Sequence, residues 1–389
     1  MDHQRRRFLK RSLASSAGLA AGSILPAGLL GKAYQQDVRF EEVILKPERP
    51  AAPTESIRFS VIGLNHGHIY GMTDALLGGG GELVAVYAKE PELLAGFTRR
   101  YPGVKVARNE DEILEDQSIQ LVASASIPVE RAPLGIRVME SGKDFMADKP
   151  GIVTMKQFEK VKRVQRETHR IYSITYSERL LNPASVYAGE LVASGAIGKV
   201  VQTIGLGPHR MRPDTRPDWF FDPDRAGGIL CDIGSHQSDQ FLFYTDSSSA
   251  EVALAQTGNF NTSAYPEYRD FGEMSVRSDH ATGYIRIDWF TPDGLDTWGD
   301  GRTFILGTDG YIEMRKYIDI AGREGGNHLF LVNQADTKYY NCSDVHMPYG
   351  GQLVHDVVHR TETAMTQDHC FLATELAIKA QGMAYQLGT

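Results

Sequence analysis

The sequence predicts an α/β protein in which a doubly wound parallel sheet is followed by an α+β domain with an open, mostly antiparallel sheet. From residue 57 to about residue 178, short apolar strand-like runs alternate with helical segments across short links. Beyond residue 199, strand-like runs follow one another with few helices between them. A length of 389 residues also suits two domains of ordinary size.

The first domain, residues 57–178, is expected to form the parallel sheet. Its first strand, 57–63, is a short apolar run that ends in glycine, as a buried parallel strand can. The glycine run at 78–81 follows a helix rather than a strand, so it is predicted to be a turn. The other strands are expected at 82–88, 104–107, 119–126, 144–147 and 171–176, and the helices at 68–77, 91–101, 110–115, 129–140 and 155–169.

The second domain, residues 179–389, has a different pattern. A helix at 183–194 leads into a strand at 199–206, and a loop rich in Pro, Asp and Arg at 208–224 precedes a helix at 229–244. Further strands are expected at 251–256, 283–290, 303–306, 311–314 and 329–332, before a helical tail at 353–387.

The first 33 residues have the pattern of an export signal. Arg5, Arg6 and Lys10 precede a weakly apolar stretch, 12–30, that is rich in Gly and Ser and is interrupted by a proline. The paired arginines followed by Phe-Leu-Lys resemble a twin-arginine (Tat) signal, which predicts a periplasmic protein with no stable membrane insertion once the signal is removed. The alternative is a transmembrane anchor, for which this stretch is poorly suited. Residues 34–56, with several prolines and no clear period, are predicted to be a linker.

Composition excludes several classes of function. Apolar residues make up 42% and charged residues 23%, as in ordinary globular proteins, so a disordered chain or a coiled coil is not expected. The three cysteines form no CxxC pair, which argues against a disulfide scaffold, a zinc ribbon or an iron–sulfur cluster, and no metal site is predicted. A net charge of −8 gives no general attraction to nucleic acid.

A loop after the first strand predicts a dinucleotide site, and it reads Gly63-Leu64-Asn65-His66-Gly67-His68. It is an altered GxGxxG, in which Asn65 stands at the second glycine position and His68 at the third. Backbone N–H groups and the helix dipole at such a loop face a pyrophosphate. Asparagine adopts the left-handed conformation more readily than most residues, so the loop is expected to keep its shape. The alternative is a structural turn without a ligand.

The residues after the second strand bear on the choice between NAD and NADP. The acidic residue that would bind the NAD ribose is missing from the strand's end, where Lys89 and Glu90 stand instead. Lys89 would accept the extra phosphate of NADP, whereas Glu90 leaves NAD open.

Two further motifs predict a catalytic site. Asp148-Lys149-Pro150 follows a strand at the carboxyl edge of the sheet, where ligands bind in this architecture. Asp232 and His236 are spaced i, i+4 on a predicted helix. When hydride leaves a carbinol carbon, the hydroxyl proton must also leave, and a histidine can take it. A lysine ammonium stabilises the developing negative charge, and Asp232 can orient the imidazole or bind a neighbouring hydroxyl. The alternative is that Asp232 caps a helix and His236 is a buried structural residue.

These segments resemble the Gfo/Idh/MocA oxidoreductases, named for glucose–fructose oxidoreductase and inositol dehydrogenase. The resemblance runs from residue 57 to the C-terminus, and its motifs are the Gly63 loop, 139–143 leading into 148–150, 190–198, 227–236 and 306–310. It implies a Rossmann domain at 57–178, a substrate-binding and oligomerisation domain at 179–389, and a homo-oligomer, either a dimer or a tetramer. It places Lys149 beside the nicotinamide and the reacting hydroxyl, with Asp232 and His236 in the same site.

The chain departs from the family's pattern at three cofactor contacts. Asp148 is one methylene shorter than the family's glutamate, Ser126-Ile127-Pro128 replaces its T-P-N loop, and the glycine loop is altered. Despite these departures, Ser126 and Pro128 stand at positions of the family's T-P-N loop, so they are assigned to the cofactor. The loop at 208–219 is predicted to form a sugar-binding lip, with Trp219 assigned to the cofactor and His209, Arg210 and Arg216 to the substrate.

Other polar residues carry weaker predictions. Arg179 follows a strand end and is assigned to the substrate, with Glu178 as a further candidate. His355 and His359 nearly match HExxH but lack its glutamate, so they are expected on an ordinary solvated helix face. Cys231, next to Asp232, is expected to pack rather than react.

The leading hypothesis is an exported NAD- or NADP-dependent oxidoreductase acting on a CH–OH group of a sugar, cyclitol or related polyol. Because free nicotinamide cofactor should be scarce outside the cytoplasm, we expect a tightly held cofactor that is regenerated within the site. One alternative is a redox-neutral glycosidase or lyase that uses transient oxidation. Another is a sugar- or nucleotide-binding protein that has kept the fold and lost turnover.

Overall fold

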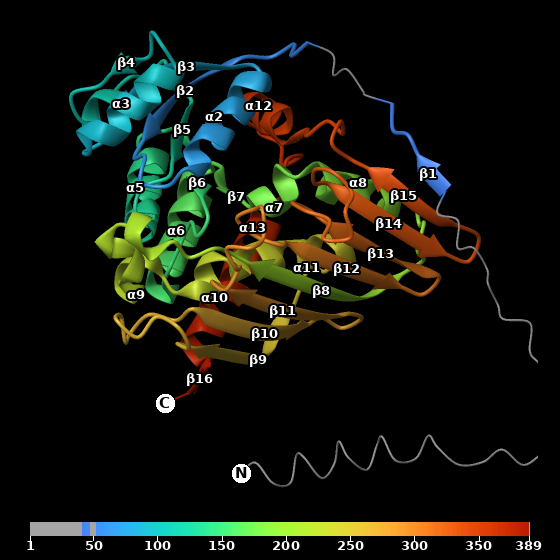
Figure 1. Cartoon of the computed structure of the whole chain (residues 1–389). Coiled ribbons are helices and arrows are strands. Elements are labelled where there is room, and N and C mark those ends of the chain that lie inside the picture. Colours follow the sequence, from blue (N-terminus) through green and yellow to red (C-terminus); the bar gives the residue numbers. More distant parts are fainter. Residues whose placement is uncertain (1–40, 47–51, 389) are drawn as a thin grey trace, which may run out of the picture. The chain divides into compact units, whose positions relative to one another are not determined.

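Two sheets organise the chain, as the sequence predicts (Figure 1). The computed structural model describes residues 41–46 and 52–388, so the predicted signal peptide lies outside the described residues. A six-stranded parallel sheet has the order β4-β3-β2-β5-β6-β7, and a ten-stranded mixed sheet has the order β1-β15-β14-β13-β12-β8-β11-β10-β9-β16. The predicted fold class is confirmed.

The parallel sheet forms where the apolar runs were found. Its central strands are buried, and proline opens α3 and α5, where no intrahelical N–H bond is lost. Asn109 and Thr154 cap α4 and α6 with their side chains. The strands are β2 Ile57–Ile62, β3 Gly81–Tyr87, β4 Lys105–Val106, β5 Leu121–Ser124, β6 Asp144–Asp148 and β7 Tyr172–Thr175. The helices are α2 His68–Gly78, α3 Pro91–Arg100, α4 Glu110–Leu114, α5 Pro128–Glu140 and α6 Met155–Thr168.

The mixed sheet carries helices on one face, with α8 and α11 packed against its middle strands. Its strands are β1 Glu41–Val43, β8 Val200–Pro208, β9 Glu251–Gly258, β10 Phe271–Arg277, β11 Thr282–Asp288, β12 Arg302–Gly307, β13 Gly310–Arg315, β14 His328–Asn333, β15 Thr337–Asn341 and β16 Tyr385–Leu387. The helices of this half are α7 Ser177–Leu180, α8 Pro183–Ala193, η1 Pro213–Thr215, η2 Asp218–Phe221, α9 Pro223–Ala226, α10 Ile229–Asp232, α11 Gly234–Thr245, α12 Tyr349–His359 and α13 Gln367–Met383.

Antiparallel pairs predominate in this sheet, and the parallel pairs are β1 with β15, β8 with β11 and β9 with β16. Strands β10 and β15 are absent from the sequence prediction because their apolar alternation is weak. The short strand β1 lies inside the segment expected to be a linker, and it pairs through Glu41–Val43 with β15. A three-residue strand has no periodicity to read, so only its partner reveals it.

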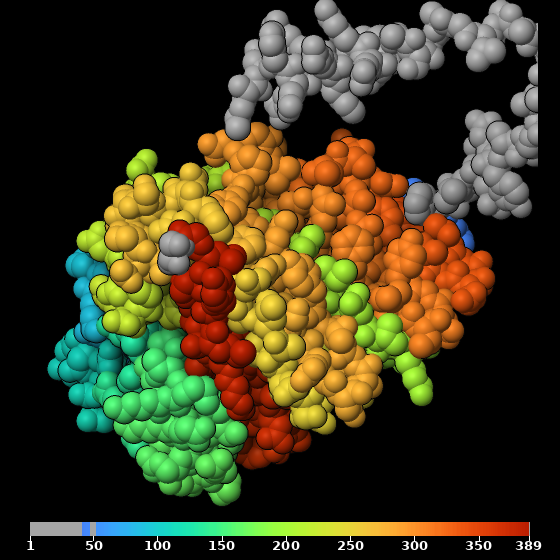
Figure 2. All heavy atoms as spheres, turned by 90° about the horizontal axis from the view of Figure 1, so that it is seen from below, coloured from blue at the N-terminus to red at the C-terminus, as the bar shows by residue number. Residues whose placement is uncertain are grey.

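The helix predicted at 229–244 is interrupted at Ile233, between α10 and α11. The helical tail is likewise divided into α12, α13 and the short strand β16. Helix α13 packs against α6, α10, α11 and β9, so it connects the two halves. Figure 2 shows this C-terminal segment, in red, between the green helices of the first half and the yellow strands of the second. None of the helices in the described part of the chain has the length and apolar character needed to span a membrane.

Candidate active site

An ion pair joins the two halves of the chain at the carboxyl edge of the parallel sheet. Lys149 follows β6, and its Nζ donates to Oδ1 of Asp232, the last residue of α10, at 2.8 Å. The Lys149 side chain is 4% exposed, so the charge is paired away from bulk water. Burial alone would raise the pKa of Asp232, but the Lys149 ammonium holds that pKa below its usual value. The structure thus brings together two of the three predicted catalytic residues.

A cleft opens above this ion pair and encloses about 1160 Å³, its mouth included. One wall carries the loop after β2, and the other carries aromatic and basic side chains of the second half. Of the predicted site residues, the cleft is lined by Asn65, His66, Gly67, His68, Pro128, Lys149, His209, Arg210, Arg216, Trp219 and Asp232. Most of the predicted site therefore gathers around one space.

Asp148, which replaces the family's glutamate, contacts the histidines of the altered glycine loop, so two of the departures from the family pattern lie side by side. Its carboxylate is fully buried and bonds Nδ1 of His66 at 2.6 Å and Nδ1 of His68 at 2.9 Å. Nη2 of Arg131 lies 3.1 Å from the same carboxylate. Burial opposes ionisation of Asp148, yet Arg131, His68 and His66 hold its pKa well below the usual range. The histidines of the altered loop and the shortened acid thus form one hydrogen-bonded unit.

The unit of His66, His68 and Asp148 has two further properties. Burial and the neighbouring His68 lower the pKa of His66 to about 4, so this imidazole is neutral at pH 7. The three side chains present ligand atoms within 4.8 Å of one another, a spacing that a metal ion accepts. Arg131 already neutralises the carboxylate, which favours the hydrogen-bonded unit over a metal centre.

The backbone of the Gly63 loop fits a dinucleotide. Gly63 has φ +85°, and a Cβ added there would lie 2.6 Å from Oγ of Ser126, so only glycine is accommodated. Gly67 is the N-cap of α2, and no side chain caps this helix. The N–H groups of Ile69 and Tyr70 donate to the carbonyls of His66 and Gly67, so the helix dipole and the N–H groups of Gly67 and His68, which line the cleft, remain for a ligand. A Cβ added at Gly67 would meet open space. The phosphate-binding part of this loop is therefore formed by backbone atoms, as binding of a pyrophosphate requires.

The side chains around the loop are used differently from the prediction. Asn65 does not adopt the left-handed conformation that was expected; instead, its Nδ2 donates to Glu90 at 2.9 Å. Lys89 follows β3, is largely exposed and lies 3.7 Å from Glu130. Leu64 is buried in the core, so only its backbone is available to a ligand.

The loop after β5 packs against the Gly63 loop through Ser126. Ser126 is buried and shares a 2.6 Å hydrogen bond with Ser124. Pro128 begins α5 and lines the cleft. Ser126 therefore lies beside Gly63, and Pro128 lines the same cleft as Asn65 and His66.

His236 lies deeper than predicted. Its side chain is 1% exposed, and its ring lies 6.3 Å from that of His68 and 6.4 Å from that of Tyr176. Its Nδ1 has no hydrogen-bond partner among the described residues. Burial lowers the pKa of His236 to about 3, so the ring is neutral at pH 7 and is a weaker base than an exposed histidine. Because α10 ends before α11 begins, Asp232 and His236 do not share one continuous helix face.

The predicted lip is built from stacked rings and cations. His209 lies 4.6 Å from Trp298 and 5.3 Å from Trp289, measured between ring centroids. Burial lowers the pKa of His209 to about 4. Arg216 stacks over Phe220 at 4.7 Å and over Trp289 at 5.0 Å. The lip thus offers flat apolar surfaces beside hydrogen-bonding groups.

The guanidinium groups of the lip are partly used within the protein. Arg210 donates to the backbone carbonyls of Pro292 and Leu295, which ties two loops together. Arg216 donates from Nε to the carbonyl of Met211 at 2.9 Å. Trp219, from η2, remains on the cleft wall.

Arg179, predicted from the sequence to bind the substrate, does not line the cleft and is paired within the protein. Its Nε and Nη2 each donate to Asp239 at 2.6 Å, and its guanidinium lies 4.5 Å from the ring of Phe243. Asp239 also bonds Nε2 of His369 at 2.9 Å. Glu178, the residue before Arg179, lies closer to the site. It is buried and pairs with Lys316 at 3.0 Å, and its negative charge partly opposes the lowering of the His236 pKa.

Sequence reasoning missed Arg131, Trp289 and Trp298. Arg131 is fully buried, and its Nε donates to the carbonyl of Ser126 at 2.7 Å while Nη1 donates to carbonyls of residues 148–150. It therefore fixes the turn that presents Lys149. An arginine on an otherwise apolar helix stretch was the available signal.

His355 and His359 lie on α12, as expected, but they have a partner. Glu55, before β2, bonds Nδ1 of His355 at 3.0 Å and Nε2 of His359 at 2.6 Å. The hydrogen bonds from these histidines lower the pKa of Glu55. Cys231 is buried, in agreement with a packing role.

Comparison with known proteins extends these observations. The oxidoreductase-family model with an NAD-binding Rossmann fold matches residues 57–176. The model of the GFO/IDH/MocA C-terminal domain matches residues 186–313.

A crystal structure named as an oxidoreductase, from Erwinia carotovora atroseptica SCRI1043, is 45% identical with a TM-score of 0.83, and the match covers 85% of this chain and all of that one. The structure of a levoglucosan dehydrogenase with NADH and L-sorbose has the same fold, at 17% identity and a TM-score of 0.66, over 84% of this chain and 97% of that one. An NADP-dependent scyllo-inositol 2-dehydrogenase of Bacillus subtilis (strain 168) is 27% identical over 46% of this chain. The match spans only about half the length of that relative, 50%. The two family models and the similarity to the Erwinia protein show that the chain belongs to the Gfo/Idh/MocA oxidoreductases.

Proposed function

We propose that this protein is an NAD- or NADP-dependent oxidoreductase that acts on a secondary alcohol or ketone of a sugar, cyclitol or related polyol. The observation that carries the proposal is the Lys149–Asp232 pair at 2.8 Å, at the base of a cleft that also contains the dinucleotide loop. A nicotinamide ring bound there would take up or deliver hydride.

The chain's own residues handle the oxygen and the proton. Lys149 donates a hydrogen bond to the reacting oxygen and stabilises its negative charge. Asp232 holds the ammonium in place and binds a neighbouring hydroxyl. The neutral, unpaired imidazole of His236 takes the hydroxyl proton.

Names of related proteins support a polyhydroxylated substrate. They include scyllo-inositol 2-dehydrogenase and levoglucosan dehydrogenase among sequence relatives, and an aldose-aldose oxidoreductase among structural neighbours. The aromatic lip of this chain, with Trp219, Trp289 and Trp298, offers a surface suited to a sugar ring.

Replacement of Lys149 tests the proposal. Lys149→Met should lower kcat/KM for any accepted sugar by about 10²–10³-fold, because the oxygen loses its charged donor. Lys160→Met, at an exposed position on α6, is the matched control and should leave activity unchanged. Full activity of Lys149→Met would contradict the proposed site.

Cofactor content is tested separately. Mass spectrometry of the denatured, as-purified protein should detect a released dinucleotide. If none is released and none binds on titration, the chain is a binding protein rather than an enzyme. If sugar is consumed without a net change in NAD(P)H, the redox-neutral alternative is favoured.

Export through the twin-arginine route is part of this proposal and rests on the sequence of residues 1–33. That route carries folded proteins, so the cofactor can be acquired before export. Fusing residues 1–33 to a reporter and replacing Arg5 and Arg6 with lysine should abolish transport. Transport that survives this change would contradict the twin-arginine assignment.

Assembly into a homo-oligomer is also proposed. Leu254, Tyr284, Leu306 and Tyr311 are exposed on the face of the ten-stranded sheet opposite its helices, and strand pairing places them in adjacent rows. A second copy of the chain would cover this apolar face. Leu306→Lys should convert the assembly to monomers in light scattering, and an unchanged mass would contradict this interface.

A further inference from the structure

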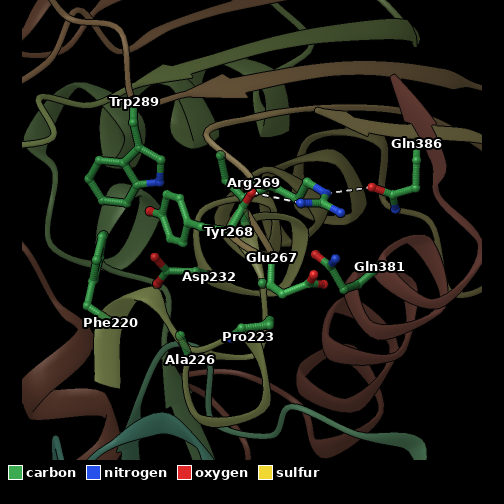
Figure 3. Close-up of a pocket in the computed structure, with 12 residues that line it drawn as sticks. Phe220, Pro223, Ala226, Asp232, Glu267, Tyr268, Arg269, Trp289, Gln381 and Gln386 are labelled. Atoms are coloured by element: carbon green, nitrogen blue, oxygen red, sulfur yellow. Dashed lines mark hydrogen bonds between the residues drawn. The ribbon is translucent and has the colours of Figure 1, made fainter. Parts of the chain in front are cut away.

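A second pocket adjoins the cleft and shares Asp232 with it, and Figure 3 shows the residues that line this second pocket. We call it the outer pocket, and it encloses about 590 Å³, its mouth included. Phe220, Ala226, Asp232 and Trp289 line both the cleft and the outer pocket. All residues that line the outer pocket belong to the second half of the chain, between Phe220 and Gln386. The outer pocket is therefore separate from the dinucleotide loop but continuous with the substrate side of the cleft.

One wall of the outer pocket is aromatic. The ring of Phe220 lies 5.4 Å from that of Tyr268 and 5.1 Å from that of Trp289, and all three side chains are buried to at least nine-tenths. Figure 3 shows these three rings together on one side of the pocket, with the Asp232 carboxylate next to them. Fixed rings of this kind present apolar faces at little conformational cost, and they suit the C–H face of a pyranose.

The opposite wall carries amides and charged groups. Gln381 uses its Oε1 to accept from the N–H of Leu230 at 3.0 Å, which leaves its Nε2 as a donor toward the pocket. Gln386 accepts from Nε of Arg269 at 2.5 Å, and its Nε2 donates to the carbonyl of Ala384 at 3.4 Å, which leaves one N–H for a ligand. Glu267 is exposed at the mouth. A polyhydroxylated ligand would find both donors and acceptors here.

The charge of the outer pocket selects among such ligands. The Asp232 carboxylate is already paired with the Lys149 ammonium at 2.8 Å, and Glu267 and Arg269 add one charge of each sign to the lining. The charges around the outer pocket therefore balance. A charged group entering the pocket would lose hydration without gaining an opposite net charge, whereas a neutral unit would not.

We propose that the outer pocket binds a second, uncharged sugar unit, so that the substrate is a neutral disaccharide or similar glycoside. The reacting unit lies in the cleft at Lys149, a placement that rests on the proposed function, and the second unit lies between the aromatic wall and the two glutamines. The outer pocket then sets specificity for substrate length and charge and takes no part in the chemistry.

The test narrows the outer pocket at Glu267, which lines this pocket but not the cleft. Glu267→Trp fills the mouth, and Glu267→Gln changes only the charge. The probes are glucose with maltose and cellobiose, galactose with lactose and melibiose, and lactobionic acid as a disaccharide analogue with an anionic outer unit.

We expect at least one disaccharide to exceed its parent hexose by tenfold or more in kcat/KM. Glu267→Trp should remove at least tenfold of that advantage, while activity on the hexose stays within twofold. Lactobionic acid should be at least tenfold poorer than lactose, and Glu267→Gln should reduce this difference. Equal effects on hexose and disaccharide, or no effect on either, would overturn the proposal.

Direct binding separates this proposal from the proposed function. Calorimetric titration of the full-length protein with the same probes needs no turnover, and it can be repeated on Lys149→Met. Disaccharide binding that persists in Lys149→Met but is lost in Glu267→Trp supports the outer pocket even if no sugar is oxidised. If none of the disaccharides binds, the outer-pocket proposal is wrong, whatever the enzyme does with monosaccharides.

Discussion

The Arg179–Asp239 pair distinguishes a structural role from the substrate role that the sequence predicts for Arg179. The Arg179 side chain is 8% exposed and that of Asp239 is 0% exposed, and two hydrogen bonds of 2.6 Å join them. Arg179→Met keeps the unbranched stem and removes the charge. Asp239 would then stay buried with His369, at 2.9 Å, as its remaining ionisable partner.

Loss of one partner of a buried ion pair costs about 3–5 kcal/mol, because the other charge is left uncompensated. Since His369 can still bond Asp239, we expect a loss near the lower end, about 3 kcal/mol. At roughly 2 °C per kcal/mol for a chain of this size, the melting temperature should fall by about 6 °C. KM for the substrate should not change, because Arg179 does not line the cleft.

Urea unfolding and steady-state kinetics on the same preparations check both parts of this prediction. Arg163→Met is the control, since Arg163 makes only an exposed i, i+4 pair with Glu167, and the expected change is within about 0.5 kcal/mol. Adding Asp239→Leu to Arg179→Met should recover part of the lost stability. Unchanged stability together with a tenfold higher KM would refute the structural role and restore the substrate role.

Four further predictions concern the site. The pKa of His236 is lowered to about 3 and those of His66 and His209 to about 4, so all three bind protons on unfolding when the pH is below about 6.5. Stability should therefore fall as the pH falls from 6.5 toward 4, and urea unfolding of His236→Gln should show a shallower fall; an identical slope would contradict this. Because neutral His236 is the proposed base, kcat/KM should have no acid limb near pH 6.5. Asp148→Asn should cost about 3–5 kcal/mol of unfolding free energy, since Arg131 loses its buried counter-charge, and wild-type stability would show that the unit of His66, His68 and Asp148 is dispensable. Gly63→Ala should destabilise the loop by at least about 1 kcal/mol and weaken dinucleotide binding, whereas Gly67→Ala should leave stability unchanged, as calorimetry can check.

Periodicity revealed the elements whose stability comes from their own apolar runs. The six strands of the parallel sheet were found to within a few residues. Continuous burial leaves a continuous apolar run in the inner strands β2 and β5, whereas β3 is partly exposed and β4 is exposed. The mixed sheet was found less completely. Strands β1, β10, β15 and β16 are short or irregular in their alternation, and they exist because a neighbouring strand offers hydrogen bonds.

In the candidate site too, features set by local sequence were predicted and contacts between distant residues were not. Lys149, Asp232 and the Gly63 loop were predicted because local motifs place them at strand ends and helix starts. The contacts of Asp148 with Arg131 and with His66 and His68 were not predicted, since they join residues 17 to 82 positions apart. The pairing of Arg179 with Asp239 was not predicted for the same reason, because the two residues are 60 positions apart.

The sequence by itself determined the order of strands and helices in the parallel-sheet half, the position of the dinucleotide loop and the residues at the carboxyl edge of the first sheet. These features depend on residue type and on spacing within one or two elements. Only the tertiary structure decided which charges are satisfied internally and which remain for a ligand. That decision depends on burial and on partners distant in the chain, which set the free energy of every charged group.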